Sequence, residues 1–256
     1  FQKKNSYTRA LDRIWGNLTD TRMHITGGLG AVHGIEGFGP SYLLPNADAF
    51  NETCAAVGNV LFNFRMFLVH KNAKYLDVAE VSLLNNVLAA VNLEGNRFFY
   101  VNPLEADGKY PFNHGTMGRA PWFGTACCPS NMARLLPQVQ GMTYAYDDEN
   151  LYLAMYADTS TKLDIGGTTL AVSQKTNYPN DGKVEVSLNP EKVTNFNLRL
   201  RIPTWTGKQF VPGKLYSYLD TTSEKWSVSV NGKKVNPKIE LGFAVLNRKW
   251  KKGDKV

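Results

Sequence analysis

The spacing of apolar residues changes once along this chain, and that change constrains the fold more than any other feature of the sequence. In the first part of the chain, apolar residues recur every three or four positions, which is typical of amphipathic helices. Beyond Tyr144 they alternate with polar residues, as in residues 184–188 and 196–202, which is typical of half-buried β-strands. The pattern predicts a helical part over residues 1–147 and a β part over residues 148–256.

Two long periodic segments dominate the helical part. They cover residues 53–70 and 74–91, and because only two or three residues separate them, the two helices should form an antiparallel hairpin. A shorter amphipathic helix is predicted over residues 8–18. Residues 22–50 break the pattern with many glycines and prolines, but their aromatic and aliphatic side chains indicate an ordered loop. Ordered loops of this length are commonly functional.

In the β part, several short strands are separated by turns, and Asn231-Gly232 is a strong signal for a tight hairpin. This arrangement predicts an antiparallel β-sandwich. The β part also carries the positive charge: residues 1–150 hold 12 Lys and Arg against 13 Asp and Glu, whereas residues 151–256 hold 17 against 9, which gives the net charge of +7. Because these lysines are scattered through strand-like sequence, without an arginine-rich helix, we expect no nucleic-acid partner.

The composition excludes several other classes of protein. A hydrophobic content of 43% is sufficient for a sizeable core. The longest apolar runs are only a few residues long, far short of the ~20 that a membrane-spanning helix needs. Three cysteines are too few for a disulfide framework, and an odd number suits catalysis or metal ligation better.

Two of the cysteines, Cys127 and Cys128, are adjacent and immediately precede Pro129, where a helix should start. A thiol at a helix N-terminus faces unpaired backbone N–H groups, which stabilise its thiolate form. Glu52 and Cys54 flank the start of another predicted helix. Three sulfurs and one carboxylate are sufficient for a tetrahedral zinc site. The alternatives are small core cysteines, or a thiol redox protein, although the Cys-x-x-Cys spacing of such proteins is absent.

Glu36 is the second candidate catalytic residue. It lies in the glycine-rich loop, where a carboxylate can approach a ligand and where burial would raise its pKa. The alternative is a solvated loop glutamate. His33 carries a weaker signal, because a lone histidine usually only satisfies its neighbours.

Distinctive short motifs follow one another along nearly the whole chain. They are Thr-Gly-Gly-Leu-Gly at 26–30, Asn-Glu-Thr-Cys-Ala at 51–55, Phe-Phe-Tyr-Val-Asn-Pro-Leu at 98–104, Cys-Cys-Pro-Ser-Asn at 127–131, Arg-Ile-Pro-Thr-Trp at 201–205 and Trp-Lys-Lys-Gly-Asp at 250–254. This set resembles the bacterial β-L-arabinofuranosidases of glycoside hydrolase family 127 and their close relatives. The combination of Glu-Thr-Cys with Cys-Cys-Pro is the most specific part of the resemblance.

The resemblance implies part of an (α/α)6 barrel followed by an antiparallel β-sandwich domain, and a retaining glycosidase that releases a non-reducing-end β-L-arabinofuranosyl or related pentose-like residue from plant-type glycans. Carried over by motif, the zinc ligands would be Glu52, Cys54, Cys127 and Cys128. Cys127 would also be the nucleophile and Glu36 the general acid/base. His33, Glu80 and Tyr100 would contact substrate, and Glu80 has the alternative of an exposed helix carboxylate.

The resemblance also sets what is expected of the chain as a whole. A barrel of twelve helices needs roughly twice the helical sequence present, so the N-terminal barrel helices and the end of the β domain should be missing and the isolated segment should be inactive. The alternative from another class is a non-catalytic carbohydrate-binding protein, since zinc with four protein ligands is usually structural. The partner is expected to be a carbohydrate, with a homodimer left open. Localisation is not fixed; the bacterial periplasm is favoured over the cytoplasm.

Overall fold

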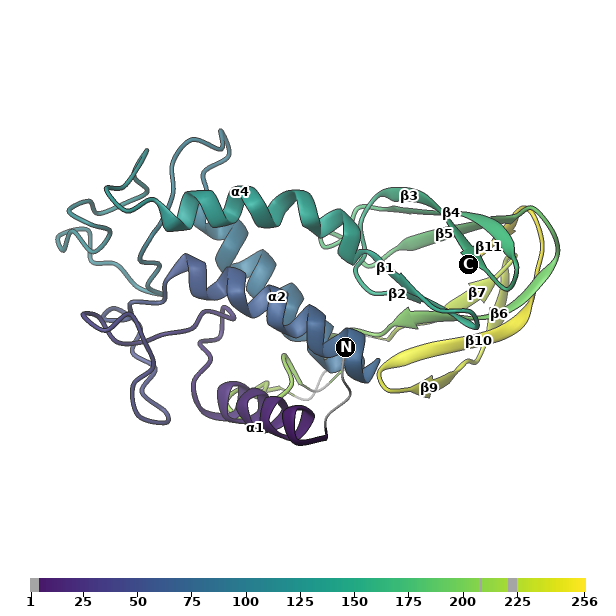
Figure 1. The fold of residues 1–256 in the computed structure, drawn as a ribbon, viewed down its shortest axis with the longest axis horizontal. Helices are drawn as coiled ribbons and strands as arrows, with labels where there is room; N and C mark the ends of the chain where they lie inside the picture. Colours follow the sequence, from purple (N-terminus) through teal and green to yellow (C-terminus); the bar gives the residue numbers. More distant parts are fainter. Residues whose placement is uncertain (1–4, 208, 221–224) are drawn as a thin grey trace. The chain divides into compact units, whose positions relative to one another are not determined.

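The computed structural model describes residues 5–207, 209–220 and 225–256. Helices occupy the first part of the chain and strands the second, in the predicted order (Figure 1). The chain forms two compact units, each of which combines separate stretches of sequence. The described residues of unit 1 are 5–65, 77–136 and 209–220, and those of unit 2 are 66–76, 137–207 and 225–256.

Unit 1 holds most of the helical sequence. Asn59 donates a hydrogen bond from Nδ2 to Oγ of Ser82 (2.8 Å), so the two long predicted helices pack against each other as expected of a hairpin. The first of them has the predicted bounds. The α-helices of the described residues are α1 (Asn5–Thr21), α2 (Thr53–His70), α3 (Ala73–Ser82) and α4 (Cys127–Val139).

The segment predicted as one helix over residues 74–91 changes its geometry half-way. Beyond α3 it continues as a π-helical turn (Leu83–Val87) and a 3-10 turn (Leu88–Ala90). At the point of change, the fully buried Ser82 donates a hydrogen bond from Oγ to the carbonyl of Gly27 in the long loop (3.1 Å). Single π-turns often occur near functional sites, and this one lies against the glycine-rich loop.

The loop can approach this turn only because it carries no side chain there. A Cβ atom on Gly28 would lie 2.1 Å from Oδ1 of Asn51 and 2.4 Å from Nδ2 of Asn86. Both asparagines are buried, so neither can move aside without disturbing its surroundings. The glycine motif at residues 26–30 thus serves close packing of the loop.

Helix α4 begins at Cys127, two residues before the predicted start at Pro129, so the predicted start is wrong. Proline is tolerated at the third helical position because the first four N–H groups of a helix have no intrahelical partner. Cys127 and Cys128 therefore lie inside the first helical turn. Pro137 removes one hydrogen bond from the helix interior, yet the helix continues to Val139.

Unit 2 contains all the strands. Its first sheet has the order β1-β2-β6-β10-β9, its second the order β11-β5-β4-β3, and β7 and β8 form a separate ribbon. The strands of the first sheet are β1 (Tyr144–Tyr146), β2 (Asn150–Leu153), β6 (Thr194–Arg201), β10 (Phe243–Trp250) and β9 (Lys238–Glu240). Those of the second are β11 (Asp254–Lys255), β5 (Val184–Pro190), β4 (Thr168–Thr176) and β3 (Thr159–Ile165), and the ribbon is β7 (Val228–Val230) with β8 (Lys233–Val235).

All described strand pairs are antiparallel except β2 with β6, which run parallel with Leu151 opposite Leu198. The first sheet is therefore mixed, which the prediction of a purely antiparallel arrangement missed. A parallel neighbour requires a long crossover, and here the strands β3, β4 and β5 of the other sheet supply it. The predicted hairpin at Asn231-Gly232 is confirmed: both residues have positive φ (50° and 76°) and join β7 to β8.

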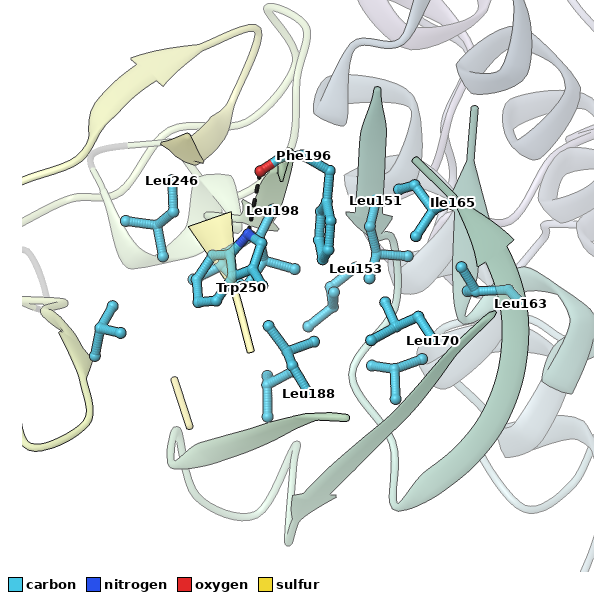
Figure 2. Close-up of a cluster of buried hydrophobic side chains, with 14 of the residues drawn as sticks. Leu151, Leu153, Leu163, Ile165, Leu170, Leu188, Phe196, Leu198, Leu246 and Trp250 are labelled. Carbon is cyan, nitrogen blue, oxygen red and sulfur yellow. Dashed lines mark hydrogen bonds between the residues drawn. The ribbon is translucent and has the colours of Figure 1, made fainter. Parts of the chain in front are cut away.

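The two sheets share one hydrophobic core (Figure 2). Leu151 and Leu198 from the first sheet meet Leu170 and Leu188 from the second, and all four are fully buried. Trp250 is fully buried in this core and donates its indole N–H to the carbonyl of Phe196 (3.1 Å), so its polar atom is satisfied inside an apolar environment. Alternating apolar residues on each strand therefore explain why the β part folds this way. In the described part of the chain, no helix has the length and apolar character needed to cross a membrane.

Candidate active site

Glu52, Cys54, Cys127 and Cys128 come together in unit 1, and we call these four side chains the thiol cluster. Their potential ligand atoms all lie within 4.8 Å of one another. The Sγ atoms of Cys54 and Cys128 are 3.3 Å apart, and those of Cys127 and Cys128 are 3.9 Å apart. Oε1 of Glu52 lies 3.4 Å from Sγ of Cys127 and 3.6 Å from Sγ of Cys128. The two motifs that predict a metal site therefore meet in one place.

The thiol cluster has the donor set and the spacing of a tetrahedral zinc site. With Zn–S bonds of about 2.3 Å and Zn–O bonds of about 2.0 Å, tetrahedral angles place two sulfurs roughly 3.8 Å apart and a sulfur roughly 3.5 Å from the oxygen. Both sulfur–oxygen distances and the Cys127–Cys128 distance agree with these values. The Cys54–Cys128 distance is shorter, and all three cysteines are free thiols. The four residues fit a zinc ion.

The four residues of the thiol cluster lie at the N-terminal ends of two helices. Glu52 immediately precedes α2, where its carbonyl accepts the N–H of Ala56 (3.3 Å), and Cys54 lies in the first turn of that helix. Cys127 and Cys128 are the first two residues of α4. The first turn of a helix leaves its N–H groups without intrahelical partners, so both sets of ligands lie where partial positive charge favours anionic groups.

Asn113 fixes the segment of chain beside the cluster. Its completely buried side chain accepts hydrogen bonds at Oδ1 from the N–H groups of Tyr100 (2.8 Å) and Val101 (3.3 Å). Its Nδ2 donates to the carbonyls of Phe98 (3.2 Å) and Gly118 (2.8 Å), so the amide is fully satisfied. Sequence reasoning missed Asn113, because asparagine before His-Gly is an ordinary turn signal.

Tyr100 connects this segment to the thiol cluster. Tyr100 is 4% exposed, and its hydroxyl interacts electrostatically with Cys127. Burial, this interaction and the negative charges of Glu52 and Glu36 raise the pKa of Tyr100. The phenol therefore stays protonated beside Cys127.

The three thiols differ in how easily they ionise. The sulfurs of Cys54 and Cys128 are hydrogen-bonded to each other, and this bond lowers the pKa of Cys54 and, together with burial, raises that of Cys128. Burial raises the pKa of Cys127 to about 11, although its interaction with Tyr100 acts in the opposite direction. A thiolate at Cys127 near neutral pH, expected from zinc together with the helix N-terminus, stays a prediction. A neighbouring cation would be needed for that.

Glu36 lies in a tight turn that the backbone of Val32 and Gly37 closes with reciprocal hydrogen bonds (3.1 and 3.4 Å). Its φ of 48° lies in the left-handed region, where a non-glycine residue costs about 1–3 kcal/mol and where functional residues are often found. The side chain is exposed, so the burial predicted for it is absent. Its link to the cluster is electrostatic, because its charge contributes to the raised pKa of Tyr100.

A row of aromatic rings extends from the loop to the cluster. The ring of His33 packs edge-on against Phe50 with centroids 5.2 Å apart, and Phe50 contacts Tyr100 at 6.1 Å. His114 packs edge-on against the other side of this row, 4.4 Å from the Tyr100 ring. Two residues predicted to contact substrate, His33 and Tyr100, are thus joined through Phe50. His114 carried no distinguishing signal in the sequence.

Glu80 lies in α3 and is only 5% exposed, so the alternative of an exposed helix carboxylate is wrong. A carboxylate is costly to bury and is found inside proteins chiefly where specific partners compensate it. The burial of Glu80 agrees with a specific role in the protein rather than with a solvated surface position. Contact with a substrate stays a prediction.

Unit 2 has a cavity of about 690 Å³ that contains none of the predicted site residues. Its described lining is aromatic and basic, with no thiol and no histidine. Prominent lining residues are Tyr156, Tyr178, Trp205, Trp226, Lys183 and Lys255. Among the described residues, the one group of His, Cys, Asp and Glu side chains that could hold a metal ion lies in unit 1, so we place the candidate active site at the thiol cluster.

Comparison with known proteins matches both parts of the chain to domains of the same family. The family model described as the GH127 catalytic domain of β-L-arabinofuranosidase matches residues 1–141, and the corresponding GH127 middle domain matches residues 150–256. A non-reducing end β-L-arabinofuranosidase of Bifidobacterium longum subsp. longum is 33% identical over 241 residues, which is 91% of this chain and 34% of that protein.

Solved structures give the same family. A GH127 β-arabinofuranosidase superposes with a TM-score of 0.92 at 42% identity, and a GH127 β-L-arabinofuranosidase from Geobacillus stearothermophilus T6 with a TM-score of 0.87 at 33% identity. Each comparison covers 98% of this chain and 38% of the solved one, so this chain spans little more than a third of the length of these relatives. The resemblance drawn from the motifs is confirmed. The chain belongs to glycoside hydrolase family 127.

Proposed function

We propose that this chain carries the zinc-thiolate centre of a retaining glycoside hydrolase that releases non-reducing-end β-L-arabinofuranosyl residues, or a related pentose-like sugar, from plant-type glycans. The observation that carries this proposal is the thiol cluster, in which Cys127 is only partly buried. Cys128 is fully buried and cannot meet a sugar. Cys54 is partly buried as well, and membership of the family supports Cys127 rather than Cys54 as the nucleophile.

Glu52, Cys54, Cys127 and Cys128 would hold the zinc ion, which when bound would favour the thiolate form of its sulfur ligands near neutral pH. The Cys127 sulfur attacks the anomeric carbon as the bond from that carbon to the leaving oxygen breaks. Glu36 donates its proton to the leaving oxygen, and the sugar is left as a thioglycoside on Cys127.

In the second step Glu36 takes a proton from water while the water oxygen attacks the anomeric carbon. The carbon–sulfur bond breaks and Cys127 recovers its electron pair. Two inversions at one carbon give net retention, as in glycosidases that use a carboxylate nucleophile. The Tyr100 hydroxyl interacts with Cys127 in the free protein, which supports a role in orienting Cys127 before attack. We propose that His33 and Glu80 contact the sugar.

The architecture proposed with this function is part of an (α/α)6 barrel in residues 1–147 followed by a β-sandwich domain in residues 148–256. The helical content of unit 1 and the shared core of the two sheets support it. A non-catalytic carbohydrate-binding protein with a structural zinc is the less favoured alternative, because the relatives named above are hydrolases.

Covalent labelling separates catalysis from binding alone. The full-length, zinc-loaded protein is treated with a thiol-directed arabinofuranosyl mimic and digested for mass spectrometry. Label on Cys127, with Cys54 and Cys128 unmodified, supports the proposal. Equal labelling of Cys54 and Cys127, or none, supports a binding protein instead.

Replacing Cys54 by serine should lower zinc affinity by more than tenfold and reduce turnover with it. A neutral hydroxyl is a much weaker zinc ligand than a thiolate, and Cys54 supplies one of only three sulfurs. Zinc content per chain is measured after dialysis against a chelator, with Ser130→Ala as the control because Ser130 lies in the same motif without contacting a sulfur. Unchanged zinc content would remove Cys54 from the site.

The isolated 256-residue segment should show little or no glycosidase activity even if it binds zinc. The relatives are almost three times as long, and additional barrel helices would contribute wall to the sugar pocket. Activity toward an aryl β-L-arabinofuranoside is compared between the segment and the full-length protein at equal zinc occupancy. Turnover by the segment within about tenfold of the full-length rate would contradict this expectation.

A further inference from the structure

Cys54 has a hydrogen-bond donor that neither of the other two cysteines shares. Nδ2 of Asn131 donates to Sγ of Cys54 (3.3 Å). Asn131 lies on α4, four residues after Cys127, and residues at this spacing share one face of a helix. The bond therefore runs from the helix that carries Cys127 and Cys128 to the ligand presented by α2.

The orientation of this amide is determined by a second residue. Nη1 of Arg134 donates to Oδ1 of Asn131 (3.1 Å) and also to Oγ of Ser130 (3.3 Å). An arginine can only donate, so the atom of Asn131 that faces it must be the oxygen. The amide nitrogen is then left to face the sulfur. A rotated amide would place its oxygen lone pairs against an electron-rich thiolate, which is repulsive.

The three sulfurs of the thiol cluster thus have different partners outside the cluster. Cys127 interacts with the Tyr100 hydroxyl, and Cys128 is fully buried 4.0 Å from the carbonyl of Tyr100. Only Cys54 is held by a side chain whose direction is fixed by another side chain on the same helix. An N–H donated to a ligand sulfur leaves its remaining lone pairs directed toward the ion and restricts rotation of the thiol.

We propose that Asn131 is a positioning residue for the metal ligand Cys54, and that Arg134 holds its amide in the donating orientation. The pair ties the first turns of α2 and α4 together across the site. Groups that bond to a metal ligand from outside the coordination sphere commonly change metal affinity by about 10–100-fold when removed. This inference rests on the proposed function only in assuming that Cys54 binds zinc.

The test uses the full-length protein and measures zinc affinity by competition with a colorimetric chelator. Asn131→Leu keeps the shape of the side chain and removes its donors, and it should weaken zinc binding about tenfold or more. Asn131→Ala should have a similar effect, and Arg134→Met a smaller one, because the amide then turns freely. Ala133→Ser, at an exposed position on the same helix, is the control and should stay within twofold of the parent protein.

A cobalt-substituted sample gives a second readout that does not depend on activity. Loss of a hydrogen bond to a thiolate raises the energy of its electrons, so the sulfur-to-cobalt charge-transfer band should move to longer wavelength in Asn131→Leu. If Cys54→Ser loses zinc but Asn131→Leu keeps the parent affinity and spectrum, the inference is overturned while the proposed function stands. If Cys54→Ser also keeps its zinc, the proposed zinc site itself fails. A raised KM with unchanged zinc affinity in Asn131→Leu would assign Asn131 to the substrate and overturn the inference as well.

Discussion

Replacing Cys127 by alanine in the full-length protein should lower kcat/KM for an aryl β-L-arabinofuranoside by about 10⁴-fold or more. The substitution removes the atom that forms the covalent intermediate, and loss of a nucleophile in other hydrolases has effects of this size. Cys127→Ser should be nearly as inactive, because a serine hydroxyl ionises far less readily than a thiol. The measurement is steady-state turnover, with zinc content determined on the same samples.

Zinc content decides how the result for Cys127 is interpreted. Glu52, Cys54 and Cys128 remain in the Cys127 variants, so zinc affinity should fall but excess zinc should restore occupancy. Turnover should stay low at full occupancy. Ser130→Ala, three residues further along α4, should keep both zinc and activity. Recovery of activity when zinc occupancy is restored would show that Cys127 acts only as a ligand and would leave the nucleophile unassigned.

Sequence periodicity predicted the secondary structure best where local pattern and tertiary packing agree. Helix α2 has the predicted bounds because apolar residues recur throughout its 18 residues without an internal proline. The next helix follows the same pattern, but its π-turn at Leu83–Val87 depends on packing against the glycine-rich loop around Gly27. The parallel pairing of β2 with β6 likewise depends on how distant strands assemble, since each strand has the same alternation in either direction.

The residues of the candidate site could be predicted where their chemistry alone is distinctive. The four metal-ligand candidates could be predicted because thiols and carboxylates at two helix starts are chemically distinctive. Asn113 and Asn131 could not, because asparagine is common in turns and on helix surfaces, and its importance here comes from partners distant in sequence. The burial of Cys127, which raises its pKa in the metal-free protein, was likewise not visible in the sequence. Chemical identity is therefore visible in sequence, whereas burial and hydrogen-bond partners are not.

Replacing Glu36 by glutamine should reduce turnover of substrates with poor leaving groups by about 10²–10⁴-fold and leave zinc content unchanged. A glutamine side chain keeps the shape and the exposed position of Glu36 but can neither donate an acidic proton nor accept one from water. Substrates with good leaving groups need little protonation in the first step, so the rate of that step should fall much less for them. The second step still needs a base, and the covalent intermediate on Cys127 should therefore accumulate with those substrates.

Two measurements test the role of Glu36. The dependence of kcat/KM on leaving-group pKa should be steeper in Glu36→Gln than in the parent protein, and intact-mass spectrometry should detect the glycosylated enzyme after mixing with a good substrate. Glu105→Gln, which makes the same chemical change at another exposed loop glutamate, should leave both unchanged. Loss of zinc from Glu36→Gln would instead identify Glu36 as a metal ligand. An equal loss of rate for all leaving groups would contradict proton donation, because only a proton donor has an effect that grows as the leaving group becomes more basic.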